Sequence, residues 1–263
     1  MHGGRSGSRP GPPPKLPLIE QFFFLTCVRL RRALVIEDLA DHFKISSSTV
    51  SRYFTSWVNL MYFKFKEILI WPSRRRVDRY MPRCFKKFYP TTCIIIDCTE
   101  FYIDRPSSLA VQSSIFSVYK NHNTVKSLIG ISTDGSIVFV SDLYEGSISD
   151  RDLVIASNIA PKFDHGDSVM ADKGFDIQDL LIPFGVRLNI PPFNTKAHQM
   201  LPQDVISTQS IAAVRIHVKQ TIGRIKEHRL LNDVIDNTLF DILEQLVFVA
   251  AMLSNFQPPL VAL

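Results

Sequence analysis

The chain has 263 residues, of which 46% are hydrophobic and 21% are charged, a balance typical of a globular protein. No apolar run reaches the roughly 20 residues of a membrane-spanning helix, so we expect no membrane partner. The four cysteines form no Cys-x-x-Cys pair, which argues against a zinc site. We interpret them as reduced packing residues of an intracellular protein.

The net charge of +5 is distributed unevenly along the chain. Segment 15–90 contains 15 Lys and Arg against 6 Asp and Glu, whereas segment 91–263 contains 13 against 19. A basic first third on an acidic remainder indicates that the front of the chain meets a polyanion, although a merely soluble surface is the alternative.

Residues 1–14 are rich in Gly, Pro and Ser and have no apolar core of the kind found in a secretory signal. This composition predicts a disordered tail.

Residues 15–60 predict a helix-turn-helix domain that binds DNA. The stretch "LIEQFFFLTCVRLRRAL" is interpreted as a supporting helix, and a short second helix turns Leu39, Ala40 and Phe43 inward. After the break "KIS", Ser46 or Ser47 can cap a third helix. Its outer face carries the candidate DNA contacts, short hydroxyls and one arginine that suit base edges and phosphates: Ser48, Thr49 and Arg52. An ordinary helical hairpin is the alternative.

Residues 61–90 predict a linker punctuated by prolines. It contains a run of basic side chains that could contact phosphates, direct the protein to the nucleus, or be simply solvated: Arg74, Arg75, Arg76, Arg79 and Arg83.

From residue 91 the pattern changes to a mixed α/β sheet with helices packed on it. The expected order is a strand at 91–103, two strands around the Asp134-Gly135 turn, a helix at 149–160, a strand at 167–172, a helix at 176–185 and a strand at 186–190. A long helix at roughly 202–229 and a last helix at 237–256 complete the domain, which we bound as 91–263.

Two acids are notable for their positions in this pattern. Asp97 follows three isoleucines, and Asp172 follows "SVMA", so each is expected at the carboxyl end of a buried strand, where sites gather in α/β sheets. Two carboxylates that converge from neighbouring strands can hold Mg²⁺ or Mn²⁺. The alternative is that they cap turns or pair with nearby cations such as Lys173.

The predicted helix at 202–229 has an unusual polar face. Val214, Val218, Ile222 and Ile225 form one apolar face, but Arg215 and Lys219 stack like charges one turn apart and Gly223 lies in mid-helix. The residues alone do not explain this pattern.

Several motifs, taken together and in order, resemble the DDE transposases of the PIF/Harbinger type. They are "IIIDCTE", "YKNHNTVKSLIGISTDG", "GSISD", "VMADKGF", "LNIPPF" and "IAAVRIHVKQTIGRIK", and the front third resembles the helix-turn-helix that precedes that domain. The resemblance covers roughly residues 17–230. It implies an RNase H-like fold and cutting and joining of DNA strands with divalent metal ions.

The resemblance also assigns the site residues. The first two acids correspond to Asp97 and Asp172, which would be both the catalytic residues and the metal ligands. The third acid, a glutamate on the long helix, corresponds to Lys219. A glutamate there would offset Arg215, and Gly223 would let the helix approach the sheet closely. With lysine, we expect a weakened or lost metal site and impaired cutting.

Three readings therefore remain open. The first is a nuclear, transposase-derived protein that binds double-stranded DNA, alone or as a homo-oligomer, and has an impaired nuclease centre. The second is a working endonuclease that recruits Glu100 or Asp150 as a substitute acid. The third is a scaffold that binds only other proteins.

Overall fold

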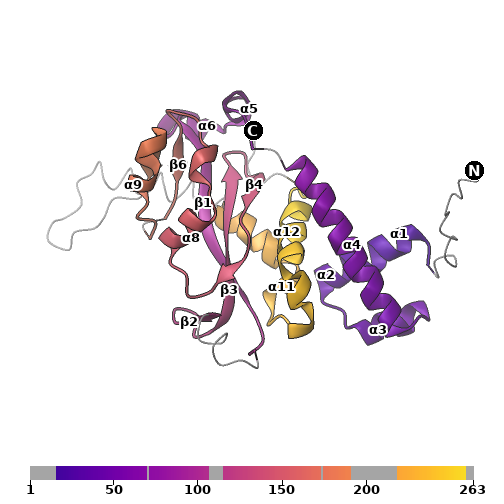
Figure 1. Cartoon of the computed structure of the whole chain (residues 1–263). Coiled ribbons are helices and arrows are strands. Elements are labelled where there is room, and N and C mark those ends of the chain that lie inside the picture. Colours follow the sequence, from indigo (N-terminus) through magenta and orange to yellow (C-terminus); the bar gives the residue numbers. More distant parts are fainter. Residues whose placement is uncertain (1–15, 70, 107–114, 173, 191–217, 259–263) are drawn as a thin grey trace, which may run out of the picture.

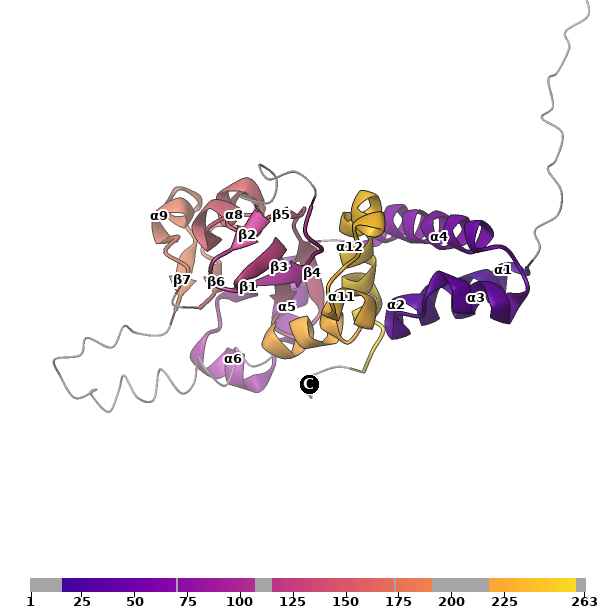
Figure 2. The same ribbon diagram turned by 90° about the horizontal axis from the view of Figure 1, so that it is seen from below.

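The computed structural model describes residues 16–69, 71–106, 115–172, 174–190 and 218–258. The expected tail at 1–14 and most of the expected helix at 202–229 lie outside these residues. Figures 1 and 2 show a sheet with its helices, with the N-terminal helices at one side.

The N-terminal domain is entirely helical. The supporting helix runs without a break through α1 (Leu18–Glu20), η1 (Gln21–Cys27) and α2 (Val28–Arg32), and η1 has the wider π-helical turn. Next come α3 (Ile36–Phe43) and α4 (Ser47–Ile68). Leu39 and Ala40 of α3 are buried and Phe43 is partly buried, so the predicted inner face of this helix is confirmed. Val50 and Phe54 of α4 are buried against it.

Two features of this domain differ from expectation. The expected boundary at residue 60 falls inside α4, which continues to Ile68 because Met61 and Tyr62 are also buried. The expected linker contains two helices, α5 (Arg74–Tyr80) and α6 (Arg83–Phe88).

The turn between α3 and α4 bends at Lys44, whose φ of 53° is the left-handed conformation that glycine adopts more easily.

The body is a mixed α/β sheet of RNase H-like type, as predicted. In the middle, β1 (Thr92–Tyr102) pairs antiparallel with β3 (His122–Ser132) on one side and parallel with β6 (Ser168–Met170) on the other. Beyond β6 lies the parallel β7 (Arg187–Asn189). Three short strands add to β3: β2 (Phe116–Ser117), β4 (Ile137–Val140) and β5 (Tyr144–Glu145).

Helices and turns connect and cover these strands. The expected helix at 149–160 is α8 (Asp150–Ala156), followed by η2 (Ala160–Lys162). The helix expected at 176–185 consists of α9 (Gln178–Leu181) and η3 (Ile182–Phe184). Residues 218–226 are helical and are followed by α11 (Arg229–Asn232), η4 (Asn237–Ile242) and α12 (Leu243–Ser254).

The last helix joins the two halves of the molecule. In both views α12 lies between the sheet and α4 (Figures 1 and 2), and it contacts β4 as well as α4. The Tyr62 hydroxyl donates a hydrogen bond to Glu244 Oε1 at 2.9 Å, and its ring meets that of Phe248 edge to face. By length and composition alone, Asn237–Ser254 would suit a membrane span, but 56% of that segment is buried inside the protein, as in a core helix.

Candidate active site

The pairing of β1 with β6 brings Asp97 and Asp172 into corresponding positions. Ile95 lies opposite Met170 in the parallel register, and each acid follows two residues later on its own chain segment. Both side chains are half-buried and line the same cleft. The expectation that Asp97 ends its strand is wrong, because β1 continues to Tyr102 through its antiparallel pairing with β3. What ends near Asp97 is the parallel pairing with β6.

The cleft has a volume of about 730 Å³ and is lined by parts of the chain that are far apart in sequence. They are β1, β2 and the turn that follows it, β3, the loop before α8 with the first residue of α8, the segment after β6, and the helical segment 218–226. Its walls carry four acids and four lysines: Asp97, Glu100, Asp150, Asp172, Lys120, Lys126, Lys219 and Lys226.

Lys219 reaches this cleft because of the helix that carries it. Val218 and Ile225 are completely buried and Ile222 is partly buried, so the predicted apolar face is confirmed for the three of its four residues that the structure describes. Lys219 is exposed and lines the cleft together with Asp97 and Asp172. Val214 and Arg215 lie outside the described residues.

The role expected for Gly223 is wrong. Gly223 is exposed, and a Cβ atom added there would meet none of the described residues within 4 Å, so the glycine is not needed for a close approach to the described sheet. Nothing in the structure explains it.

The two candidate substitute acids both line the cleft, but one carboxylate oxygen of each already contacts another side chain. Glu100 is buried and accepts a hydrogen bond from Thr124 Oγ1 at 2.7 Å. Asp150 Oδ1 lies 3.3 Å from Lys126 Nζ, which also donates to the backbone oxygen of Ile148 at 2.8 Å. A metal ion bound at the same oxygen of either acid would have to displace these partners.

The thiol of Cys98 belongs to the same set of contacts. Burial raises its pKa, and a hydrogen bond to the neighbouring Asp150 carboxylate raises it further. A thiol with a raised pKa is a poor nucleophile and a poor metal ligand. This agrees with the interpretation of Cys98 as a packing residue.

A glycine brings the loop before α8 against β3. The N–H of Gly146 donates to the backbone oxygen of Thr124 at 2.9 Å, and an added Cβ would lie 2.0 Å from Thr124 Oγ1. No other residue fits so close to the strand. The "GSISD" motif therefore starts with glycine because its loop crosses β3 at this point to deliver Asp150.

The metal ions implied by the resemblance do not fit the side chains present. Among the residues that the structure describes, no group of three or more His, Cys, Asp or Glu side chains is arranged to hold a metal ion. Mg²⁺ and Mn²⁺ prefer oxygen ligands, and the cleft offers an ammonium at the third position that the resemblance assigns. The side chains present therefore support no catalytic step through a metal.

Sequence reasoning missed the lysines on the cleft walls other than Lys219. Lys126 is the clearest case, because it interrupts the apolar run of β3 and is only 9% exposed. A lysine within a buried strand almost always has a partner, and this signal could have been recognised in the sequence. Lys120 and Lys226 have no such signal, because each lies in a polar stretch.

The candidate DNA-binding helix is only partly as predicted. Ser46 caps α4, and its side chain accepts the N–H of Thr49. Ser48 and Arg52 are exposed on the outer face, as expected. Contrary to expectation, Thr49 does not lie on the exposed outer face. It is 7% exposed, and its hydroxyl is 2.8 Å from that of Ser46. Because it lies in the first turn against the cap, Thr49 cannot offer its hydroxyl to a base.

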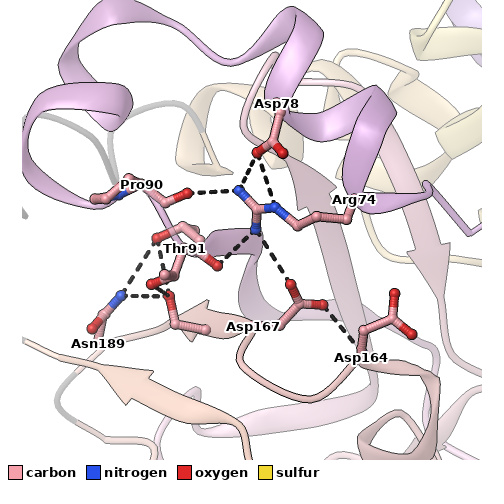
Figure 3. A network of polar contacts seen from close by, with 9 residues as sticks. Arg74, Asp78, Pro90, Thr91, Asp164, Asp167 and Asn189 are labelled. Atoms are coloured by element: carbon pink, nitrogen blue, oxygen red, sulfur yellow. Dashed lines mark hydrogen bonds and ion pairs between the residues drawn. The ribbon is translucent and has the colours of Figure 1, made fainter.

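The arginines of the basic run in the linker fall into two groups, one turned inward and one exposed. Figure 3 shows Arg74 turned inward, where it joins Asp78, the buried Asp167 and the backbone oxygens of Pro90 and Thr91. Arg74 is therefore a structural residue, not a phosphate contact. The other arginines of the run are exposed: Arg75, Arg76, Arg79 and Arg83.

Comparison with known families covers both parts of the chain. The family model described as "DDE superfamily endonuclease" matches residues 96–255. The model described as "Helix-turn-helix of DDE superfamily endonuclease" matches residues 14–67. Among curated proteins, none matches the sequence. With more than half of its length matched, including the segments that carry Asp97 and Asp172, the chain belongs to the DDE superfamily endonucleases.

Proposed function

We propose that this protein is a nuclear, Harbinger-type transposase derivative that binds double-stranded DNA and cuts it weakly or not at all. Its helix-turn-helix contacts the duplex through Ser48 and Arg52. Its nuclease-type domain keeps the first two acids of the family, Asp97 and Asp172. The observation that carries the proposal is that the helical segment 218–226 presents Lys219 to the cleft these acids line.

The physical reason concerns the charge at the third position. Divalent metal ions held by Asp97, Asp172 and a third acid would supply activation of the attacking oxygen and stabilisation of the leaving oxygen, and would require all three ligands. An ammonium about 4 Å from a unit positive charge repels it by about 1 kcal/mol in water and by about 4 kcal/mol at an effective dielectric of 20. For a divalent ion the repulsion is twice as large, about 2 to 8 kcal/mol, and it would lower metal affinity about thirtyfold to about a millionfold.

A Lys219→Glu variant tests the proposal. We expect millimolar Mn²⁺ to leave the melting temperature of the wild type almost unchanged and to raise that of the variant. Metal at about 100 times its dissociation constant adds about 2.7 kcal/mol, or about 5–10 °C for a chain of this size. Without metal the variant should melt below the wild type, because three acids then repel one another in one cleft.

The matched control is Arg224→Glu, which makes the same change of charge on the same helical segment, at a residue that does not line this cleft. It should show no gain from Mn²⁺. Nicking of supercoiled plasmid by the Lys219→Glu variant would extend the result to activity. A wild type that gains as much from Mn²⁺ as the Lys219→Glu variant would refute the assignment of Lys219.

A further inference from the structure

The turn between β2 and β3 carries two apolar side chains that project into solvent. Val118 is 86% exposed and Tyr119 is 87% exposed, the highest values among the large hydrophobic residues that the structure describes. Two adjacent side chains of this kind at a loop tip are unfavourable in water unless a partner covers them. The identity of that partner can be argued from what surrounds them.

The turn is held in a defined conformation. Ser117 pairs with His122 across the hairpin, and the backbone N–H of Lys120 donates to Ser117 Oγ at 3.3 Å. Asn121 adopts the left-handed conformation, with φ of 50°, which closes the turn. At the base, the rings of His122 and Tyr102 meet edge to face. Tyr119 is thus presented on an anchored support.

The surroundings of Tyr119 match those of a nucleic-acid site. Val118, Tyr119 and Lys120 all line the cleft that contains Asp97 and Asp172. The ammonium of Lys120 lies 4.9 Å from the centre of the Tyr119 ring. An aromatic ring beside cations at the edge of a groove is the arrangement that proteins use to bind single-stranded nucleic acid, with bases stacked on the ring.

A second lysine supports an anion at this place. Lys226 Nζ donates to the backbone oxygen of Glu100 at 2.9 Å. Burial lowers the pKa of Lys226, and the nearby charge of Lys120 lowers it further. The positive charges of Lys120 and Lys226 repel each other, and a phosphate bound between them would stabilise the charged form of both.

We propose that the turn 118–121 binds an unpaired nucleotide at the end of a DNA duplex, with the base stacked on Tyr119 and its phosphate between Lys120 and Lys226. The inference rests on the proposed function, since it assumes that DNA enters the cleft. It adds a preference for ends that are open over ends that are fully paired. An aromatic side chain of a protein partner would suit Tyr119 but would not use the two lysines.

The test compares the full chain on two labelled duplexes of the same sequence. One is fully paired, and the other has three unpaired nucleotides at one end, including the fluorescent base 2-aminopurine. We expect the wild type to bind the open end more tightly and to quench its fluorescence. Stacking of a base on an aromatic ring contributes about 5- to 150-fold to binding affinity. Tyr119→Ala should therefore bind the open end up to that much more weakly and should no longer quench the fluorescence.

Two further variants make the result specific. Tyr119→Phe keeps a ring and should keep both the preference and the quenching. Phe256→Ala removes another aromatic side chain, 72% exposed, that does not line the cleft, and it should behave as the wild type. Because Tyr119 is so exposed, its replacement should not affect folding, which a thermal melt checks.

The outcomes separate this inference from the proposed function. If the wild type binds both duplexes equally, or if Tyr119→Ala keeps the preference and the quenching, the stacking role is refuted while DNA binding stands. If no form of the protein binds either duplex, both proposals are refuted together.

Discussion

Replacing Arg74 by glutamine should strongly destabilise the fold. The guanidinium of Arg74 donates to the backbone oxygens of Pro90 at 2.6 Å and Thr91 at 2.9 Å, just before β1. It also lies 3.3 Å from Asp167 Oδ1, just before β6, and pairs with Asp78 on its own helix. One side chain thus fixes α5 to the starts of the two strands that carry the candidate site (Figure 3).

The magnitude follows from the burial of its partner. The side chain of Asp167 is only 5% exposed, and removing one member of a buried ion pair costs about 3–5 kcal/mol. Arg74 itself is 28% exposed, so water can partly replace it, and we expect a loss nearer to about 3 kcal/mol. For a chain of this size that corresponds to a melting temperature lower by about 6–12 °C.

A thermal melt followed by circular dichroism measures this loss. Arg75→Gln is the matched control, because Arg75 is the next residue of the same helix, has the same charge and is exposed. It should change the stability by less than about 0.5 kcal/mol. If the two variants melt within about 2 °C of each other, the structural role of Arg74 is refuted and the basic run again becomes a candidate DNA surface as a whole.

Further predictions concern DNA binding and pH. Arg52→Ala should weaken binding to duplex DNA and reduce the salt slope by about 1, measured by fluorescence anisotropy, because Arg52 is exposed on α4. Thr49→Val should leave DNA binding unchanged but lower the free energy of unfolding, measured in urea, by about 1 kcal/mol, because the buried Thr49 hydroxyl contacts the helix cap. If Thr49→Val weakens DNA binding as much as Arg52→Ala does, the burial argument is refuted. Burial lowers the pKa of His228 below its ordinary value of 6.5, so below about pH 6.5 the unfolded chain binds more protons and stability falls with falling pH. The His228→Gln variant should lose less stability than the wild type between pH 7 and 5, measured by urea unfolding at each pH. If both forms lose stability equally over this range, the role of His228 is refuted.

Local patterns in the sequence were sufficient for most of the elements, but not for α5, α6 or the end of α4. The apolar period of α4, the serine at its cap and the run of isoleucines in β1 each reflect interactions within a few residues. Asp97 and Asp172 were noticeable because each follows an apolar run, and Lys219 because it stacks on the like charge of Arg215, but it was the resemblance that assigned the three positions to one site. These features depend on neighbours along the chain, so they are readable without the fold.

Only the tertiary structure decided which side chains meet. Lys126 reaches Asp150 because β3 pairs with β1 and the loop at Gly146 crosses β3, and neither contact has a local signal. Thr49 was predicted on an outer helix face, and Arg74 was one of a basic run with three possible roles, but packing turned both inward. The reason is physical: a helix or strand period fixes which residues share a face, whereas the register and packing of distant segments determine what that face contacts.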